Sequence, residues 1–148
     1  MSIFRWTAVR HGWVSFELHK AGGPPYRATV GDSTDVFKIL IDAVSKLLGE
    51  GSSQIVSFDN EPGELRWELV PQGGCVSIRV ALHSTWGEGG GEDRWTDPCV
   101  DARTLALDIV SSMEELRTSM GDEEFRKNWL AYPFPETEME SLMALIRS

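Results

Sequence analysis

The sequence contains few cysteines, and it lacks both long apolar runs and the short motifs that identify common reactions. Only Cys75 and Cys99 occur among its 148 residues, so we do not expect a disulfide scaffold. No apolar run approaches the roughly 18 residues that a membrane-spanning helix needs. The first residues do not have the basic-then-apolar layout of a secretory signal. These absences predict a cytoplasmic protein that does not bind membranes.

Motifs for phosphate binding and hydrolysis are also absent. The glycine cluster between Ser84 and Pro98 is not followed by Gly-Lys-Ser/Thr, which excludes a phosphate loop. A dinucleotide fingerprint starting at Gly87 would need a glycine where the chain has Glu92. No Gly-x-Ser-x-Gly sequence marks a nucleophile. Without these motifs, we expect a protein that is not an enzyme.

Metal-ligand spacing is missing as well. His11, His19 and His83 are far apart in the sequence, and lone histidines are more often structural than ligating. The acids between Glu88 and Asp97 lack the alternating spacing of a calcium-binding loop. We therefore expect neither a bound metal nor another cofactor.

Basic side chains are outnumbered, and the imbalance lies in one part of the chain. The net charge is −9. Residues 1–86 contain nine acids and eight bases, whereas residues 87–148 contain 14 acids and six bases. A negative field of this kind repels nucleic acid and anionic membranes and attracts basic proteins. Acidic residues also keep a protein soluble, so charge alone does not separate binding from solubility.

The clearest positive signal is the alternation of apolar and polar residues within 54–83. This period of two, interrupted by Pro/Gly turns, predicts an antiparallel meander with one apolar face and one charged face. On the charged face, Glu64 and Glu68 could form an acid–base pair. However, Arg66 between them and Arg79 on the next strand favour ion pairing. The residues expected on the apolar face are Leu65, Trp67, Leu69, Val76, Ile78, Val80 and Leu82.

The remaining patterns predict further strands first and then mostly helices. The other expected strands are Ile3–Val9, Trp13–His19 and Tyr26–Val30. The expected helices are Val36–Leu48 with Gly49 as its C-cap, a helix from Pro98 to Gly121, Asp122–Leu130, and Glu136–Ile146. This order favours a single α+β domain over residues 1–148. Its antiparallel sheet would have five or six strands, with helices packed on one face.

The segment Ser84–Pro98 is predicted to be a loop, and it contains two of the six tryptophans. Exposed tryptophan beside acids is typical of a binding surface. The alternative is that both rings fold back onto the outer face of the sheet. Core packing would account for Trp13, Trp67 and Trp129. The residues expected to bind a partner are Trp86, Glu88, Glu92, Asp93 and Trp95.

The layout resembles that of small acidic immunity-type proteins encoded beside bacterial toxins. The resemblance lies in an N-terminal sheet with a helix, a meander carrying Glu64-Leu65-Arg66-Trp67-Glu68-Leu69, and a C-terminal helix pair joined by residues 129–135. It implies a protein that binds a toxin and blocks its active site. The size and acidity are also similar to those of type III secretion chaperones, which implies a homodimer. Those chaperones usually begin with a helix, whereas this chain begins with strands.

The expected function is therefore a non-enzymatic module that binds a basic protein, which the resemblance implies to be a toxin. The alternative is a ligand-binding or hydrolytic α+β domain with a cleft between the sheet and the C-terminal helices. A deep pocket in which His11, His19 or His83 meets Glu64 or Glu68 would favour that alternative.

Overall fold

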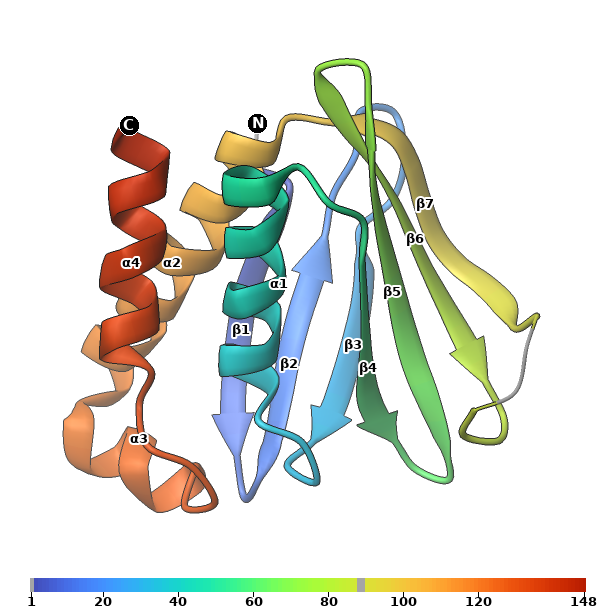
Figure 1. Ribbon diagram of the computed structural model, residues 1–148. Helices are drawn as coiled ribbons and strands as arrows, with labels where there is room; N and C mark the ends of the chain where they lie inside the picture. The colour runs from blue at the N-terminus through green and yellow to red at the C-terminus, as the bar shows by residue number, and fades with distance from the viewer. Residues whose placement is uncertain (1, 88–89) are drawn as a thin grey trace.

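The computed structural model describes residues 2–87 and 90–148 (Figure 1). It confirms the α+β class, with one antiparallel sheet whose seven strands follow the order of the sequence, and four helices. The expectation of five or six strands is wrong. The strands are β1 (Phe4–Arg10), β2 (Trp13–Leu18), β3 (Tyr26–Gly31), β4 (Gln54–Asn60), β5 (Gly63–Gln72), β6 (Cys75–His83) and β7 (Glu92–Val100). The helices are α1 (Val36–Glu50), α2 (Ala102–Met120), α3 (Asp122–Asn128) and α4 (Glu136–Arg147).

The predicted meander is present as β4, β5 and β6, with the expected alternation. Trp67 is fully buried at the centre of β5 and lies opposite Val80 on β6. On the other face of the same strands, Glu68 lies opposite Arg79. The remaining predicted core positions of β5 and β6 are buried as well, except Leu82, which is partly buried against the core.

The strand that sequence reasoning missed is β7, which takes up the second half of the predicted Ser84–Pro98 loop and continues to Val100. Its pairing with β6 shifts register twice, between Val76 and Ile78 and between Val80 and Ala81. Each shift interrupts the period of two, so the strand leaves no alternating pattern in the sequence. Pro98 is compatible with this position because β7 is an edge strand.

Several helix boundaries also differ from those predicted, and two of these differences change a capping residue. Helix α2 begins at Ala102 rather than at Pro98, and the Asp101 carboxylate caps it by accepting the backbone N–H of Thr104 at 3.0 Å. The C-cap of helix α1 is Gly51 rather than Gly49. Gly51 adopts φ 64°, the left-handed conformation in which glycine carries no steric penalty.

The core lies between the strands and the first two helices. The Trp67 ring is 5.9 Å from Phe4, 5.4 Å from Phe16 and 6.2 Å from Phe58, so strands from both halves of the sheet share one aromatic cluster. Helix α1 packs against β4, α2 packs against β1, and α4 packs on α1 and α2. The expected arrangement, with every helix on one face of the sheet, is therefore too simple.

Helix α2 runs along the free edge of β1. The Asp108 carboxylate accepts the backbone N–H groups of Ile3 and Phe4 at 2.6 and 3.2 Å. The Ser112 hydroxyl accepts the backbone N–H of Trp6 at 3.1 Å. These side chains occupy groups through which an edge strand would otherwise pair with another chain, so this edge is closed.

Candidate protein-binding surface

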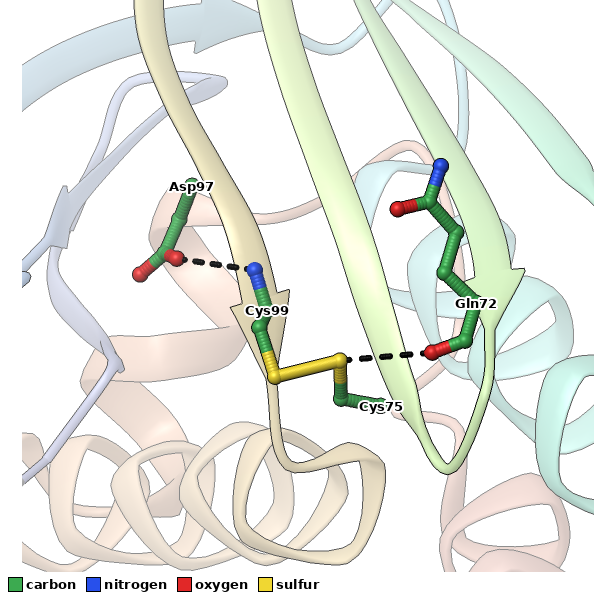
Figure 2. Close-up of a disulfide and its surroundings, with 4 residues drawn as sticks. All are labelled: Gln72, Cys75, Asp97 and Cys99. Carbon is green, nitrogen blue, oxygen red and sulfur yellow. Dashed lines mark hydrogen bonds between the residues drawn. A yellow bond between two sulfur atoms is a disulfide. The ribbon is translucent and has the colours of Figure 1, made fainter.

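The β6–β7 hairpin is closed at its base by a disulfide between Cys75 and Cys99 (Figure 2). The two Cα atoms are 5.2 Å apart. The Asp97 carboxylate accepts the backbone N–H of Cys99 at 3.1 Å, and the Cys75 sulfur lies 3.4 Å from the carbonyl oxygen of Gln72. The sequence did not indicate this disulfide, and Cys99, which fell in the helix expected from Pro98, lies instead on β7. The hidden strand β7 is the reason, since it brings Cys99 beside the first residue of β6.

The two tryptophans of the predicted loop have opposite environments. Trp86, which follows β6, is 44% exposed, whereas Trp95 on β7 is only 5% exposed. Trp95 lies opposite the core residue Val80, which places its ring in the aromatic and aliphatic core. Trp95 is therefore not available to a partner, and this part of the predicted site is wrong. Trp86 has the exposure that a binding residue needs.

Both described acids of the predicted site lie on β7 and are exposed. The Asp93 carboxylate pairs with Arg79 at 2.5 Å, and Arg79 also pairs with Glu68 on β5 at 2.6 Å. The hydrogen bonds that Arg79 donates, first to Glu68 and then to Asp93, raise the pKa of its guanidinium, which stays charged. It also donates to the carbonyl oxygen of Gly90 at 3.0 Å. The arginine thus ties three segments together, and its pairing with Glu68 confirms the expected cross-strand ion pair.

The predicted site contains two further acids, Glu92 and Glu88. Glu92 is exposed and pairs with Arg94 at 3.2 Å on the same strand. Glu88 lies outside the described residues. The structure therefore brings Trp86, Glu92 and Asp93 onto one hairpin and removes Trp95 from the set.

Behind this hairpin, Glu64 and His83 lie directly opposite each other on β5 and β6. Each is only 2% exposed, although both belong to the face that was expected to be charged and solvated. Gly91 packs so closely on His83 that a Cβ at this position would lie 2.4 Å from its Nε2 atom, and its φ of +85° also favours glycine. Burial separates the pair from substrates in solvent, and no hydrogen bond joins them within the described residues.

Glu64 pairs with Arg66 and not with Glu68, the residue with which it could have formed an acid–base pair. Its carboxylate accepts a hydrogen bond from the Arg66 guanidinium at 2.7 Å. Both ring nitrogens of His83 are buried, and neither has a hydrogen-bond partner among the residues that the structure describes. The sequence carried no signal for this arrangement, because the glycine cluster does not indicate that Gly91 packs on His83.

A second candidate site is a cavity of about 570 Å³ at α3 and the segment that leads to α4. Phe125, Trp129, Tyr132 and Phe134 contribute aromatic rings to its lining. Leu130 also lines it, although 79% of this side chain is exposed. The alternative hypothesis placed a cleft between the sheet and the C-terminal helices, whereas this cavity lies within the helical part. In the sequence, the feature that corresponds to this cavity is the proline-rich, aromatic segment 129–135 between the last two helices.

Other kinds of site are not evident in the described parts of the chain. Within residues 2–87 and 90–148, no three His, Cys, Asp or Glu side chains are close enough to hold a metal ion. Over the same residues, no helix combines the length and the apolarity needed to cross a membrane.

The fold and the surface define an α+β protein with an exposed hairpin closed by a disulfide. Comparisons with protein families, with curated proteins and with solved structures gave no match to this chain. The geometry and the charges of the surface are therefore the features that indicate a function.

Proposed function

We propose that the protein is a non-enzymatic protein-binding module and that its β6–β7 hairpin forms the interface. The observation that carries this proposal is the exposure of Trp86 on a hairpin that is otherwise fixed in place. Large aromatic side chains supply much of the binding energy in protein interfaces.

The supports of the hairpin favour a pre-organised interface. The Cys75–Cys99 disulfide fixes its base, and Arg79 connects β6 to Asp93 on β7 and to the backbone of Gly90. A surface that is already ordered loses less conformational entropy when a partner binds. The hairpin can therefore present Trp86 without a large rearrangement.

The charge distribution favours a basic partner. Residues 87–148 contain 14 acids and six bases, and Glu92 and Asp93 are exposed beside the hairpin tip. An acidic surface speeds the encounter with a basic protein. Together with the resemblance to immunity-type proteins, this asymmetry supports a toxin as the proposed partner.

The disulfide bears on the proposed location of the protein. The sequence predicts a cytoplasmic protein, but disulfides persist mainly in oxidising compartments. Mass spectrometry of the protein from its native host, after blocking of free thiols, distinguishes the two. Two blocked thiols would support the cytoplasmic location, whereas an intact bond would place the protein in an oxidising compartment.

The decisive test compares two exposed tryptophans in binding kinetics. The partner is captured from the native host with the intact protein and identified, and the variants Trp86→Ala and Trp13→Ala are then measured against it. Trp13 is a matched control because it is 41% exposed but lies on β2, away from the hairpin. Truncating a buried aromatic anchor typically removes about 2 kcal/mol or more. Trp86→Ala should therefore speed dissociation by roughly 30-fold, whereas Trp13→Ala should not; equal kinetics for both variants would refute the proposed interface.

The charge contribution is tested by association rates. Replacing Glu92 with Gln and Asp93 with Asn should slow association, and the difference should shrink as salt screens the field. The control replaces Glu50 and Glu140 with Gln, since both are exposed acids and lie on α1 and α4 rather than on the hairpin. An association rate that ignores salt in the parent protein would show that electrostatic steering plays no part.

A further inference from the structure

The α3–α4 cavity has the size and the lining of a recognition pocket. Its volume of about 570 Å³ lies within the range of small-ligand and side-chain pockets. Most of its walls are apolar side chains, and Leu130 adds an apolar surface that is 79% exposed. Leu130 is the most exposed of the large hydrophobic side chains in the described chain, and it lies beside this aromatic cavity.

The aromatic walls are held in place before any partner arrives. Phe125 and Phe134 meet edge to face, with ring centroids 5.4 Å apart. The Trp129 and Tyr132 rings are 5.8 Å apart. The Tyr132 hydroxyl donates to the backbone carbonyl of Asp32 at 3.1 Å, which ties the wall to the segment before α1. The cavity is therefore a formed feature of the fold.

A guanidinium already occupies one side of this cavity. The Arg117 group lies 4.0 Å from the centroid of the Phe134 ring, in the geometry of a cation–π contact. Three carboxylates surround it: Glu136 at 2.9 Å, Glu114 at 3.0 Å and Asp122 at 3.8 Å. The hydrogen bond that Arg117 donates to Glu136 is the main cause of the raised pKa of Arg117. The charge of Arg117 is thus more than offset by its neighbours.

The surroundings of the cavity are negative. Glu114, Asp122 and Glu136 surround Arg117, and Asp32 and Asp35 lie close enough to Tyr132 to affect its pKa, so five acids stand against the two arginines of the lining, Arg117 and Arg126. Burial, followed by the negative charges of Asp35 and Asp32, raises the pKa of Tyr132, so its ring remains neutral and faces additional acids. Arg126 lines the cavity and has no ion-pair partner among residues 2–87 and 90–148. A single exposed cation does not compensate this excess of carboxylates, so the field disfavours an anionic occupant.

We propose that the α3–α4 cavity binds a basic segment of a partner protein, in which an aromatic or aliphatic side chain adjoins a lysine or arginine. The apolar side chain would enter between the rings, and the cation would meet the surrounding carboxylates. Arg117 over Phe134 shows that this site accommodates a guanidinium against a ring. The inference rests on the proposed function only in taking the occupant to be part of a protein, and the surface is distinct from the hairpin.

The test uses small probes, so it does not depend on the hairpin or on an identified partner. Backbone amide signals of the intact protein are followed by two-dimensional NMR during titration with a capped Trp-Arg dipeptide. Matched titrations use capped Trp-Glu, which has the same ring and the opposite charge, and octanoate, which represents an apolar anion. The Trp-Arg probe should shift signals of residues 125–136. Equal shifts with Trp-Glu or octanoate, or shifts that avoid these residues, would overturn the proposal.

Two leucine variants supply the matched control. Leu130→Ala removes three apolar carbons from the cavity wall, and because Leu130 is exposed the variant should remain folded. Its affinity for the Trp-Arg probe should fall by roughly threefold or more. Leu107→Ala, at a 44% exposed position on α2 outside the cavity, should bind as the parent does. Unchanged binding of the Trp-Arg probe by Leu130→Ala would contradict the proposal. The variant Trp86→Ala should bind the probe as the parent does, whether or not the hairpin is an interface.

Discussion

The two edges of the sheet are β1 and β7 (Figure 1), and their backbone groups are occupied in different ways. Along β1, the carboxylate of Asp108 and the hydroxyl of Ser112 on α2 accept backbone N–H groups. Along β7, no helix side chain accepts a backbone N–H group within the described residues. Pro98 has no N–H to donate, and the Lys20 amine donates to the carbonyl of Thr96 at 2.7 Å. One edge is buried under a helix, whereas the other is left accessible but poorly suited to pairing with a foreign strand.

This difference indicates how the accessible edge could be used. Because the backbone of β7 is interrupted at Pro98 and occupied at Thr96, a partner would contact side chains rather than add a strand. The exposed side chains there include Glu92 and Asp93, with Trp86 at the hairpin tip. The closed edge should therefore be important for stability, and the open edge should be important for binding.

The largest expected effect on stability comes from opening the closed edge. Trp6 is 2% exposed, and its indole N–H donates to the carbonyl of Ile109 on α2 at 3.1 Å. Trp6→Ala should lower the free energy of unfolding by about 3–5 kcal/mol, because it removes a large buried side chain and this hydrogen bond. Trp86→Ala should change it by less than about 0.5 kcal/mol. Denaturant unfolding of both variants checks the contrast; similar losses would mean that the two edges do not differ in this way.

Breaking the disulfide should have the next largest effect and should act on the open edge. The bond joins residues 24 positions apart, and loop-closure entropy for such a loop corresponds to about 3 kcal/mol. Replacing Cys75 and Cys99 with Ser together should lower the unfolding free energy by that order. A reductant should destabilise the parent to a similar extent and leave the double variant unchanged. A parent protein that is indifferent to reductant would show that the bond does not support the hairpin.

Removing the carboxylate that closes β1 should have a smaller effect. Asp108→Ala leaves the backbone N–H groups of Ile3 and Phe4 without their acceptor, which should cost about 2 kcal/mol. The comparison variant on the other edge is Asp93→Ala, which breaks an exposed ion pair with Arg79 and should cost less than about 1 kcal/mol. Thermal and denaturant unfolding measure both. A larger loss for Asp93→Ala would reverse the roles given to the two edges.

The smallest effect concerns pH at the junction between β7 and α2. Hydrogen bonds first from the Thr104 side chain and then from its backbone lower the pKa of Asp101 below its ordinary value near 3.8. A lowered pKa adds stability above the ordinary value, and this is lost as the pH falls through the folded-state pKa. The variant Asp101→Asn keeps a capping acceptor but does not titrate. As the pH falls below about 4, the variant should therefore lose less stability than the parent. The difference between the two losses should be under about 1 kcal/mol. Parallel pH profiles would contradict this assignment.

The parts of the fold that could be predicted from the sequence are those whose alternation is regular. Strands β4, β5 and β6 were found because Trp67 and its neighbours alternate without interruption. Strand β7 was not found because two register shifts and Pro98 remove the period of two. The missed disulfide follows from the missed strand, since only the pairing of β7 with β6 brings Cys99 to Cys75.

The candidate site was predicted only in part for the same reason. Trp86 lies outside regular structure, and its exposure agrees with its polar neighbours in the sequence. Trp95 has similar neighbours, but it belongs to a strand and its position opposite Val80 turns it into the core. Trp13 was expected in the core and is instead 41% exposed, because it lies on the face of β2 opposite Val14 and Phe16. Local composition could not distinguish these three tryptophans, whereas strand register does.

The most direct test of the account is amide hydrogen exchange of the protein with and without the partner captured from its native host. Binding should slow exchange along the β6–β7 hairpin, including the amides next to Trp86, and the α3–α4 segment should be protected as well if a basic segment enters its cavity. Amides of Ile3, Phe4 and Trp6 should exchange at the same rate in both states, because α2 already covers that edge. Protection along β1 and α2 with no change in the hairpin would contradict the assignment of binding to the open edge.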